Sequence, residues 1–275
     1  MTHPALTQGR AAVVTGAARG IGLAAVTRFA ALGMAVCIAD ADAAALQQAA
    51  HGLASNGADV LAVPTDVSDR AAVEALHEAC MSRWGGVAVL MNNAGRQGGG
   101  GLTAPVQRWH TILDTNFGGV LNGVQVFSPG MISVGKPAAI INTGSKQGIT
   151  TPPGDTAYNV SKAAIKVLTE ALAHDLIGTP VTAHLLIPGF TDTKLTRREP
   201  DTAQPLAWTA DQVADFMLGG LAAGDFYILC PDNQTTRETD ERRMRWAADD
   251  IILNRPALSR WHPDFAQAFA DYMKR

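Results

Sequence analysis

Tyr158 and Lys162 stand four residues apart and could move a proton together. Apolar residues recur at helical spacing from residue 157 to residue 176, so both side chains leave the same face of an expected helix. A lysine charge about 5 Å from the phenol favours the phenolate by roughly 3 kcal/mol at an effective dielectric of ~20, or about two pKa units. The spacing therefore predicts an acid/base pair; the alternative is a solvent-facing pair without chemistry.

A second candidate site is the glycine-rich turn at residues 16–22, between an apolar run and a helical stretch. Glycine lets backbone N–H groups come close to a phosphate at the positive end of a helix. Tight loops also need glycine for backbone reasons alone. The position between a strand and a helix nevertheless favours a dinucleotide site. The residues that would form it are Gly16, Arg19, Gly20, Ile21 and Gly22.

Asp40 ends the next apolar run, and an acid about 20 positions after such a turn is placed to bind the adenosine ribose hydroxyls. Its carboxylate would repel the 2′-phosphate of NADP, and Ala41 supplies no cation. Arg19 argues the opposite, because a basic residue in the turn can face that phosphate. A carboxylate at the ribose edge opposes the phosphate directly, so we predict NAD in preference to NADP. A helix-capping role for Asp40 is the alternative.

Short apolar runs alternate with helical patterns along the chain, which predicts an α/β fold of the Rossmann type. This is a doubly wound, parallel, seven-stranded sheet with helices on both faces. The expected strands are residues 11–15, 35–39, 60–63, 87–91, 138–142, 181–187 and 226–229. We expect residues 1–230 to form one dinucleotide-binding catalytic domain and residues 231–275 to form a C-terminal extension.

Composition narrows the function further. The 275 residues are 47% hydrophobic, include 27 glycines and carry a net charge of −3, which suits a domain with a large core. There is no basic block, so nucleic acid and anionic membranes are not expected as partners. No metal-binding spacing is present, and three widely separated cysteines indicate a reducing compartment. With no apolar core of a signal peptide and no membrane-length apolar run, we expect a cytoplasmic protein.

Three further segments carry local expectations. Residues 96–101 are dominated by glycine and should form a mobile loop. Residues 194–208 contain charges and two prolines without periodicity, which suggests a lid loop. Asn116 stands inside a helical stretch at residues 109–132, where an asparagine is usually solvated. His184 lies within an apolar strand and is expected to be a core histidine with satisfied hydrogen bonds.

Taken together, the motifs resemble the short-chain dehydrogenase/reductase family over about residues 8–230. The resemblance implies a sheet order of 3-2-1-4-5-6-7, with NAD(H) or NADP(H) lying across the carboxyl edge. The motifs that carry it are Thr-Gly-Ala-Ala-Arg-Gly-Ile-Gly at 15–22, Asp66-Val67, Asn92-Asn93-Ala94-Gly95, Asn116, Ser145, Tyr158 with Lys162, and Pro188-Gly189 with Thr193.

The resemblance also implies roles for individual residues. Tyr158 would be the general acid/base, and Lys162 would lower its pKa and hold the nicotinamide ribose. Ser145 would hydrogen-bond the substrate oxygen. Asn116 would anchor a proton-relay water, in place of the solvated role above. The remaining cofactor contacts would come from Asp66, Val67, Asn93, Ala94, Gly95, Pro188, Gly189, Thr191 and Thr193, with Thr191 standing where the family usually has Ile or Val.

We therefore expect an NAD-dependent oxidoreductase that interconverts a secondary alcohol and a ketone. An NADPH-dependent carbonyl reductase is the alternative that Arg19 supports. A non-catalytic dinucleotide-binding sensor or scaffold would lack part of the catalytic set, and a sugar-nucleotide epimerase or dehydratase would have different glycine spacing. The expected substrate walls, Ser145, Gln147, Phe190, Leu195 and Trp208, suggest a partly apolar small molecule.

The assembly and the tail complete these expectations. Helices at residues 109–132 and 157–176 carry more apolar residues than one sheet face needs, and the family commonly pairs them, so we expect a homotetramer. The tail contains a charged helical stretch at residues 235–252, with Trp246, Trp261 and Phe265 around it. Its aromatic content argues against disorder. We expect it to pack on the domain or on a neighbouring subunit and to help wall a substrate pocket.

Overall fold

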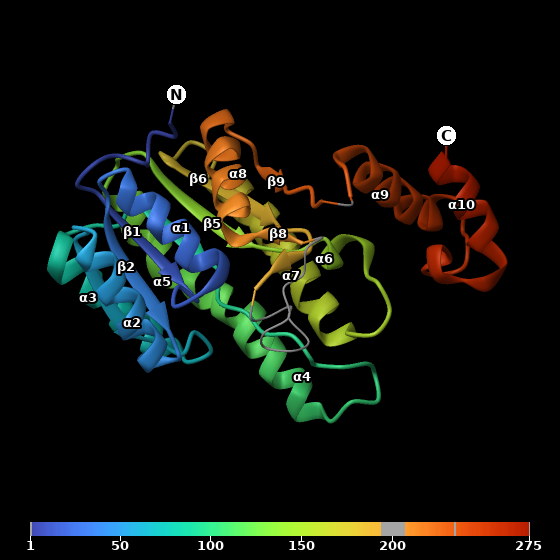
Figure 1. The fold of residues 1–275 in the computed structure, drawn as a ribbon, viewed down its shortest axis with the longest axis horizontal. Helices are drawn as coiled ribbons and strands as arrows, with labels where there is room; N and C mark the ends of the chain where they lie inside the picture. Colours follow the sequence, from blue (N-terminus) through green and yellow to red (C-terminus); the bar gives the residue numbers. More distant parts are fainter. Residues whose placement is uncertain (1, 194–206, 234, 275) are drawn as a thin grey trace.

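Seven parallel strands form the central sheet of the computed structural model, which describes residues 2–193, 207–233 and 235–274 (Figure 1). The strand order within these residues is β3-β2-β1-β4-β5-β6-β9. This is the predicted order, with β9 as the seventh strand. The strands are β1 (Ala11–Thr15), β2 (Ala35–Asp40), β3 (Val60–Pro64), β4 (Val89–Asn92), β5 (Ala138–Thr143), β6 (Val181–Ile187) and β9 (Tyr227–Leu229).

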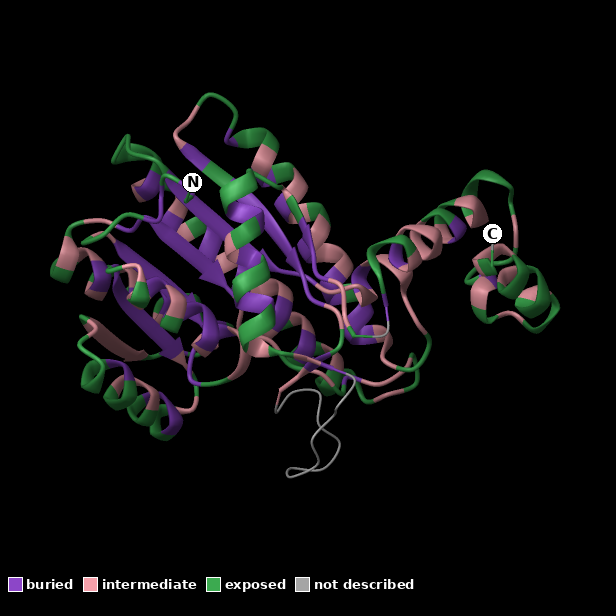
Figure 2. Cartoon of the chain, turned by 45° about the horizontal axis from the view of Figure 1, so that its top comes forward, coloured by how far each residue is buried: buried purple, intermediate pink, exposed green. Residues whose placement is uncertain are grey.

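Helices cover both faces of the sheet, because its strands are apolar on both sides. One face is covered by α1 (Gly20–Ala31), α2 (Ala43–Ser55) and α8 (Ala210–Ala223). The other is covered by α3 (Arg70–Trp84), α5 (Gly119–Ser133) and α7 (Thr156–Asp175). Along β1, Val14 packs into the first layer and Val13 into the second, so both cores are built from the same short runs. Figure 2 shows most of the strands buried between helices with exposed outer sides. The predicted doubly wound fold is confirmed.

The predicted helix at residues 109–132 is interrupted. It consists of α4 (Val106–Leu113), a π-helical turn η1 (Asp114–Gly118) and α5. A π turn inserts one extra residue into the helix, so no break appears in the apolar pattern, and such turns are frequent at functional sites. Asn116 lies in this turn and is fully buried. The expectation from its position in a helix alone, that Asn116 is solvated, is therefore wrong.

The loop at residues 96–101 is tied down by Asp155, at the start of α7. The two oxygens of this carboxylate accept hydrogen bonds from Gly98 N (2.9 Å) and Gly100 N (3.0 Å). The loop whose glycine content predicts mobility is therefore held in place by a residue 55 positions away in the sequence from Gly100. His184 is confirmed as a satisfied core histidine: its Nδ1 is 2.7 Å from the Asp225 carbonyl oxygen, and its Nε2 is 2.8 Å from Thr182 Oγ1.

Beyond β9 the chain leaves the sheet and forms α9 (Arg237–Ile252), two short 3₁₀ turns, η2 (Ser259–Trp261) and η3 (Pro263–Phe265), and α10 (Ala266–Lys274). Figure 1 shows α9 and α10 extending away from the body of the domain. Trp246 is buried within the extension itself, with its ring centroid 5.2 Å from that of Phe269 and 5.1 Å from that of Tyr272. None of the described helices is long and apolar enough to cross a membrane.

Candidate active site

A cavity of about 920 Å³ opens where β1, β4, β5 and β6 end. This is the edge at which open α/β sheets bind ligands. It gathers predicted residues from distant parts of the sequence. The ones that line it are Gly16, Arg19, Gly20, Ile21, Asp40, Asn93, Ala94, Gly95, Ser145, Gln147, Tyr158, Lys162, Pro188, Gly189, Phe190, Thr191 and Thr193.

Tyr158 lies in the first turns of α7 and is 5% exposed. Burial raises the pKa of its phenol, while hydrogen bonds from the side chains of Gln97 and Ser145 oppose this rise. Burial disfavours the phenolate because the charge loses its hydration. The phenol is therefore protonated at neutral pH in this state of the protein.

Lys162 lies one turn further along α7, and its ammonium is 5.6 Å from the centroid of the Tyr158 ring. The Nζ atom donates a 2.8 Å hydrogen bond to the carbonyl oxygen of Thr143, at the end of β5. Burial lowers the pKa of Lys162 to about 8. The predicted proximity of the two groups is present. However, a simple charge–charge argument would lower the pKa of Tyr158 and raise that of Lys162, whereas desolvation changes both pKa values in the opposite directions.

Asn116 stands behind the cavity wall. Its Oδ1 accepts a hydrogen bond from Arg96 N (2.7 Å), and its Nδ2 donates to Arg96 O (3.0 Å) and to Ser161 Oγ (3.0 Å). A side chain at Gly95 would put its Cβ 3.4 Å from Asn116 Oδ1 and 3.7 Å from Lys162 Nζ. The π turn thus brings Asn116 close to the lysine and to the floor of the cavity.

The glycine turn is packed tightly against the end of β4. Gly16 has a φ of +64°, and a Cβ there would lie 2.8 Å from Ala94 Cα. A Cβ on Gly22 would lie 2.3 Å from the carbonyl oxygen of Gly16, so Gly22 closes the turn without lining the cavity. Asn93 joins the turn through Nδ2, which donates to the carbonyl oxygens of Thr15 (3.1 Å) and Gly16 (3.2 Å). The N-terminus of α1 therefore faces the cavity with its backbone N–H groups, as an anion site requires.

At the far end of the cavity, Asp40 is held by two backbone donors. Its Oδ2 accepts from Ala18 N (3.2 Å), and its Oδ1 accepts from Asp42 N (3.0 Å). The cap of α2 is Asp42, whose side chain accepts from Ala45 N, so the capping role considered for Asp40 belongs to its neighbour. Arg19 Nη2 forms an ion pair with Asp42 Oδ2 at 2.7 Å. The charge of Arg19 is thus partly compensated beside Asp40.

The segment after β6 crosses over the glycine turn. A Cβ on Gly20 would lie 3.2 Å from Thr193 Cγ2. Thr191 lies in β7 (Thr191–Asp192), a strand that pairs with β8 (Trp208–Thr209) in a small second sheet that the sequence did not predict. Together these contacts make the 188–193 segment one wall of the cavity.

Other predicted residues lie elsewhere. Asp66 accepts hydrogen bonds from the backbone and hydroxyl of Ser68, which lower the pKa of its carboxyl, and it does not line the cavity. Val67 is buried against Gly119. Trp208 packs on Phe216, with ring centroids 5.7 Å apart, outside the cavity lining. Leu195 and most of the expected lid lie outside the described residues.

Six residues that line the cavity were not among the predicted site residues: Gln97, Gly98, Thr143, Gly144, Lys146 and Asp155. Gln97 is the first polar side chain after Arg96 in the loop that follows the small-residue motif, which is a usable signal. Asp155 stands three residues before Tyr158 and so shares its helix face. Thr143 acts through its backbone carbonyl, for which no side-chain signal exists.

Comparison with known proteins agrees with this site. A family model described as short chain dehydrogenase matches residues 10–204. The chain is 34% identical over 241 residues to 1-deoxy-11-beta-hydroxypentalenate dehydrogenase from Streptomyces avermitilis, covering 86% of this chain and 89% of that protein. It is 35% identical over 225 residues to 2-(R)-hydroxypropyl-CoM dehydrogenase from Xanthobacter autotrophicus, covering 76% of this chain and 90% of that one.

Among solved structures, a short chain dehydrogenase/reductase from Burkholderia phymatum in complex with NAD matches with a TM-score of 0.81 and 33% identity, over 90% of this chain and 96% of that one. The family model covers well over half of the present chain, and the matches extend over nearly the whole length of these relatives. The resemblance seen in the motifs is therefore confirmed. The chain belongs to the short-chain dehydrogenase/reductase family and is an NAD(P)-dependent oxidoreductase.

Proposed function

We propose that this protein is an NAD-dependent dehydrogenase that interconverts a secondary alcohol and a ketone, with Tyr158 as the general acid/base. The observation that carries the proposal is the buried phenol of Tyr158, which lines, together with Ser145, the cavity that begins at the glycine turn. Both relatives described above are named as dehydrogenases of hydroxylated molecules, which supports an alcohol as substrate.

The residues present fit a nicotinamide dinucleotide. The cavity runs from Asp40, past the N-terminus of α1, to Tyr158 and Lys162. The close packing at Gly16 leaves room for backbone N–H groups to approach a pyrophosphate. When bound, the nicotinamide supplies the hydride chemistry. Asp40 would hold the adenosine ribose, and Thr193 and Lys162 would hold the nicotinamide end.

The chain itself supplies orientation and a proton path. Ser145 would hydrogen-bond the substrate oxygen, and Tyr158 as phenolate would take the hydroxyl proton during oxidation. Asn116, which is anchored to Arg96 and close to Lys162, would continue the proton path by binding a water. Gln147 and Phe190 line the same cavity and would contact the rest of the substrate.

Arg19 supports a second candidate, an NADPH-dependent carbonyl reductase. Both side chains of the Arg19–Asp42 pair are more than 40% exposed, and such pairs are weak. A 2′-phosphate would then have to displace Asp42 while lying near Asp40. A panel of alcohols with NAD and NADP, and of ketones with the reduced cofactors, read by the absorbance of the reduced nicotinamide, tests both functions.

We expect a pH profile that differs between the two directions. Burial raises the pKa of Tyr158, so oxidation, which needs the phenolate, should speed up as the pH rises from about 6 toward 8. Reduction needs the phenol and should slow down at high pH. Since the pKa of Lys162 is lowered to about 8, the lysine loses its charge above this pH, and the rate of oxidation should then increase less steeply with pH. Profiles of kcat/KM in both directions check this, and flat profiles in both would contradict it.

We further propose a homotetramer in which α5 and α7 pair with neighbouring subunits. In one chain, Val167 and Val160 of α7 remain 63% and 44% exposed. The extension leaves Ile251 and Ile252 at 87% and 73% exposure, so a neighbouring subunit would also give this apolar end a partner. Analytical ultracentrifugation should detect a tetramer. A stable monomer at micromolar concentration would rule the assembly out.

A further inference from the structure

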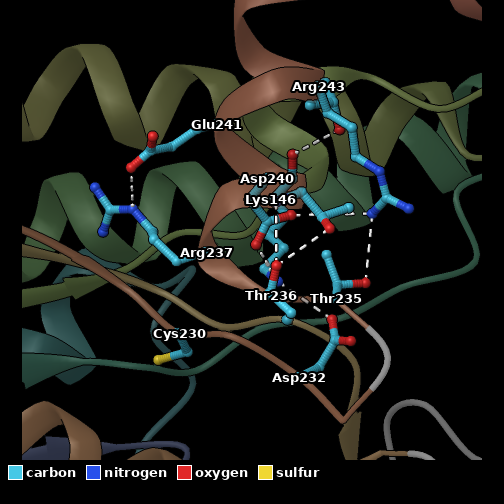
Figure 3. Close-up of polar contacts among 12 residues, drawn as sticks. Lys146, Cys230, Asp232, Thr235, Thr236, Arg237, Asp240, Glu241 and Arg243 are labelled. Atoms are coloured by element: carbon cyan, nitrogen blue, oxygen red, sulfur yellow. Dashed lines mark hydrogen bonds and ion pairs between the residues drawn. The ribbon is translucent and has the colours of Figure 1, made fainter. Parts of the chain in front are cut away.

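Lys146 directly follows Ser145, and its side chain is held by the C-terminal extension. The Nζ atom lies 2.5 Å from Asp240 Oδ2 and 3.2 Å from Asp232 Oδ2. Asp232 follows β9, and Asp240 stands in the first turn of α9 (Figure 3). The residue after the proposed substrate-binding serine is thus clamped by two carboxylates from a part of the chain about 90 residues away.

The three side chains are largely withdrawn from water. Their exposed fractions are 17% for Lys146, 11% for Asp232 and 7% for Asp240. Burial raises the pKa of the Asp240 carboxyl, and Lys146 and Arg243 oppose this rise. Removing one member of a buried ion pair leaves the other charge without compensation, so such pairs resist rearrangement. The cluster is therefore a firm connection rather than a surface contact.

The cluster of Lys146, Asp232 and Asp240 also packs against the wall of the cavity. A Cβ on Gly189 would lie 2.7 Å from Asp232 Oδ2 and 2.9 Å from Lys146 Nζ. The backbone N–H of Lys146 donates to the carbonyl oxygen of Pro188 at 3.4 Å. Gly189, Pro188 and Lys146 all line the cavity. The position of the Ser145 loop, the position of the 188–189 turn and the position of α9 are therefore mechanically connected.

An anion-binding role for Lys146 fits this geometry poorly, because two carboxylates already flank its ammonium group. A purely stabilising clasp would fit the ion pairs. It does not account for the location of these ion pairs, which lie one residue from Ser145 and in contact with the neighbouring 188–189 turn. Helix α9 also contacts the helix α6 (Gln147–Thr150), which begins after Lys146, so the same connection extends to α6.

We propose that Lys146 is a positioning residue, through which Asp240 and Asp232 of the C-terminal extension fix the Ser145 loop and the 188–189 turn in their working geometry. This inference rests on the proposed function of Ser145 in binding the substrate oxygen. It assigns the extension an effect on catalysis through the subunit's own cavity. The rest of α9 and α10 remains free to serve the assembly.

The test is Asp240→Asn, which keeps the side-chain volume and leaves Lys146 paired with Asp232. We expect kcat for alcohol oxidation to fall about tenfold, since a misplacement of ~1 Å at an active site can cost about a hundredfold. The KM for NAD should change by less than kcat, because the glycine turn and Asp40 are untouched and only the contacts expected from Pro188 and Gly189 are disturbed. Amide hydrogen exchange should become faster in the segments around Ser145 and Gly189.

Glu241→Gln is the matched control on the neighbouring position of α9. Glu241 pairs with Arg237 (3.0 Å) and Arg245 (3.3 Å) on its own helix and does not reach the cavity. This variant should retain the kinetics and the exchange pattern of the unmodified protein. If Asp240→Asn lowers the melting temperature but leaves kcat and the exchange around Ser145 unchanged, the ion pairs only stabilise the fold and the inference is wrong.

Asp232→Asn keeps the inference testable if Asp240→Asn does not fold, because it removes the less buried carboxylate. The same fall in kcat and the same faster exchange are expected, and their absence would overturn the inference. The exchange measurement needs no substrate. An unmodified protein that oxidises no alcohol would therefore refute the proposed function while the exchange data still decide on the clamp.

Discussion

Tyr158→Phe is expected to abolish turnover while NAD affinity stays almost unchanged. The hydroxyl carries the proton in the proposed reaction, and general acid/base catalysis contributes about a hundredfold to ten-thousandfold. The ring without its hydroxyl still fills the same buried position, where the side chain is 5% exposed. Steady-state kinetics together with NAD titration of the variant measure the two quantities separately.

Two further variants test whether the loss of turnover is specific to the hydroxyl of Tyr158. Lys162→Ala should damage both turnover and NAD binding, because the lysine serves the phenol and the nicotinamide ribose in the proposal. Tyr227→Phe removes a tyrosine hydroxyl that bonds to Glu170 at the outer end of the sheet, away from the cavity, and should leave kcat unchanged. Full activity in Tyr158→Phe would refute the mechanism.

The second large effect concerns cofactor choice. Replacing Asp40 by Ala and Ala41 by Arg should move the preference from NAD toward NADP. The double change removes a carboxylate at the ribose edge and adds a phosphate partner. One close charge pair is worth roughly 3 kcal/mol at 5 Å and an effective dielectric of ~20, so the ratio of affinities should change by about a hundredfold. Binding of NADH and NADPH by fluorescence titration checks it.

Asp42→Asn separates the roles of Asp40 and Arg19. Asparagine caps a helix as well as aspartate does, so α2 should keep its cap while Arg19 loses its ion-pair partner. We expect only a small change toward NADP from this variant, because Asp40 remains. If the unmodified protein binds NADPH more tightly than NADH, Arg19 prevails and the NAD preference is wrong.

Most of the strands were predictable because each is an apolar run buried on both faces. Val13 and Val14 of β1 pack into different cores, so no alternation is needed and the run stands out in the sequence. The helix that contains Asn116 was less predictable. Its π turn inserts an extra residue without changing the apolar pattern, and only hydrogen bonds to Arg96 and Ser161 reveal the asparagine as buried.

The sequence by itself determined the strand runs, the glycine turn and the helical spacing of Tyr158 and Lys162, because these patterns depend on residues close together in the chain. The order of the strands and the meeting of the glycine turn with Tyr158 and Lys162 were implied by the resemblance to the family that these motifs carry. The sequence also predicted, through the distance from the glycine turn, that Asp40 belongs to the same site, and Asp40 lines the cavity.

The tertiary structure alone decided how strongly these groups are desolvated and what holds them. Burial raises the pKa of Tyr158 and lowers that of Lys162 to about 8, which a spacing argument cannot supply. The clamp of Asp240 and Asp232 on Lys146 also appears only after folding. Desolvation and ion pairing depend on every element that packs around a charge, and most of those elements are remote in sequence.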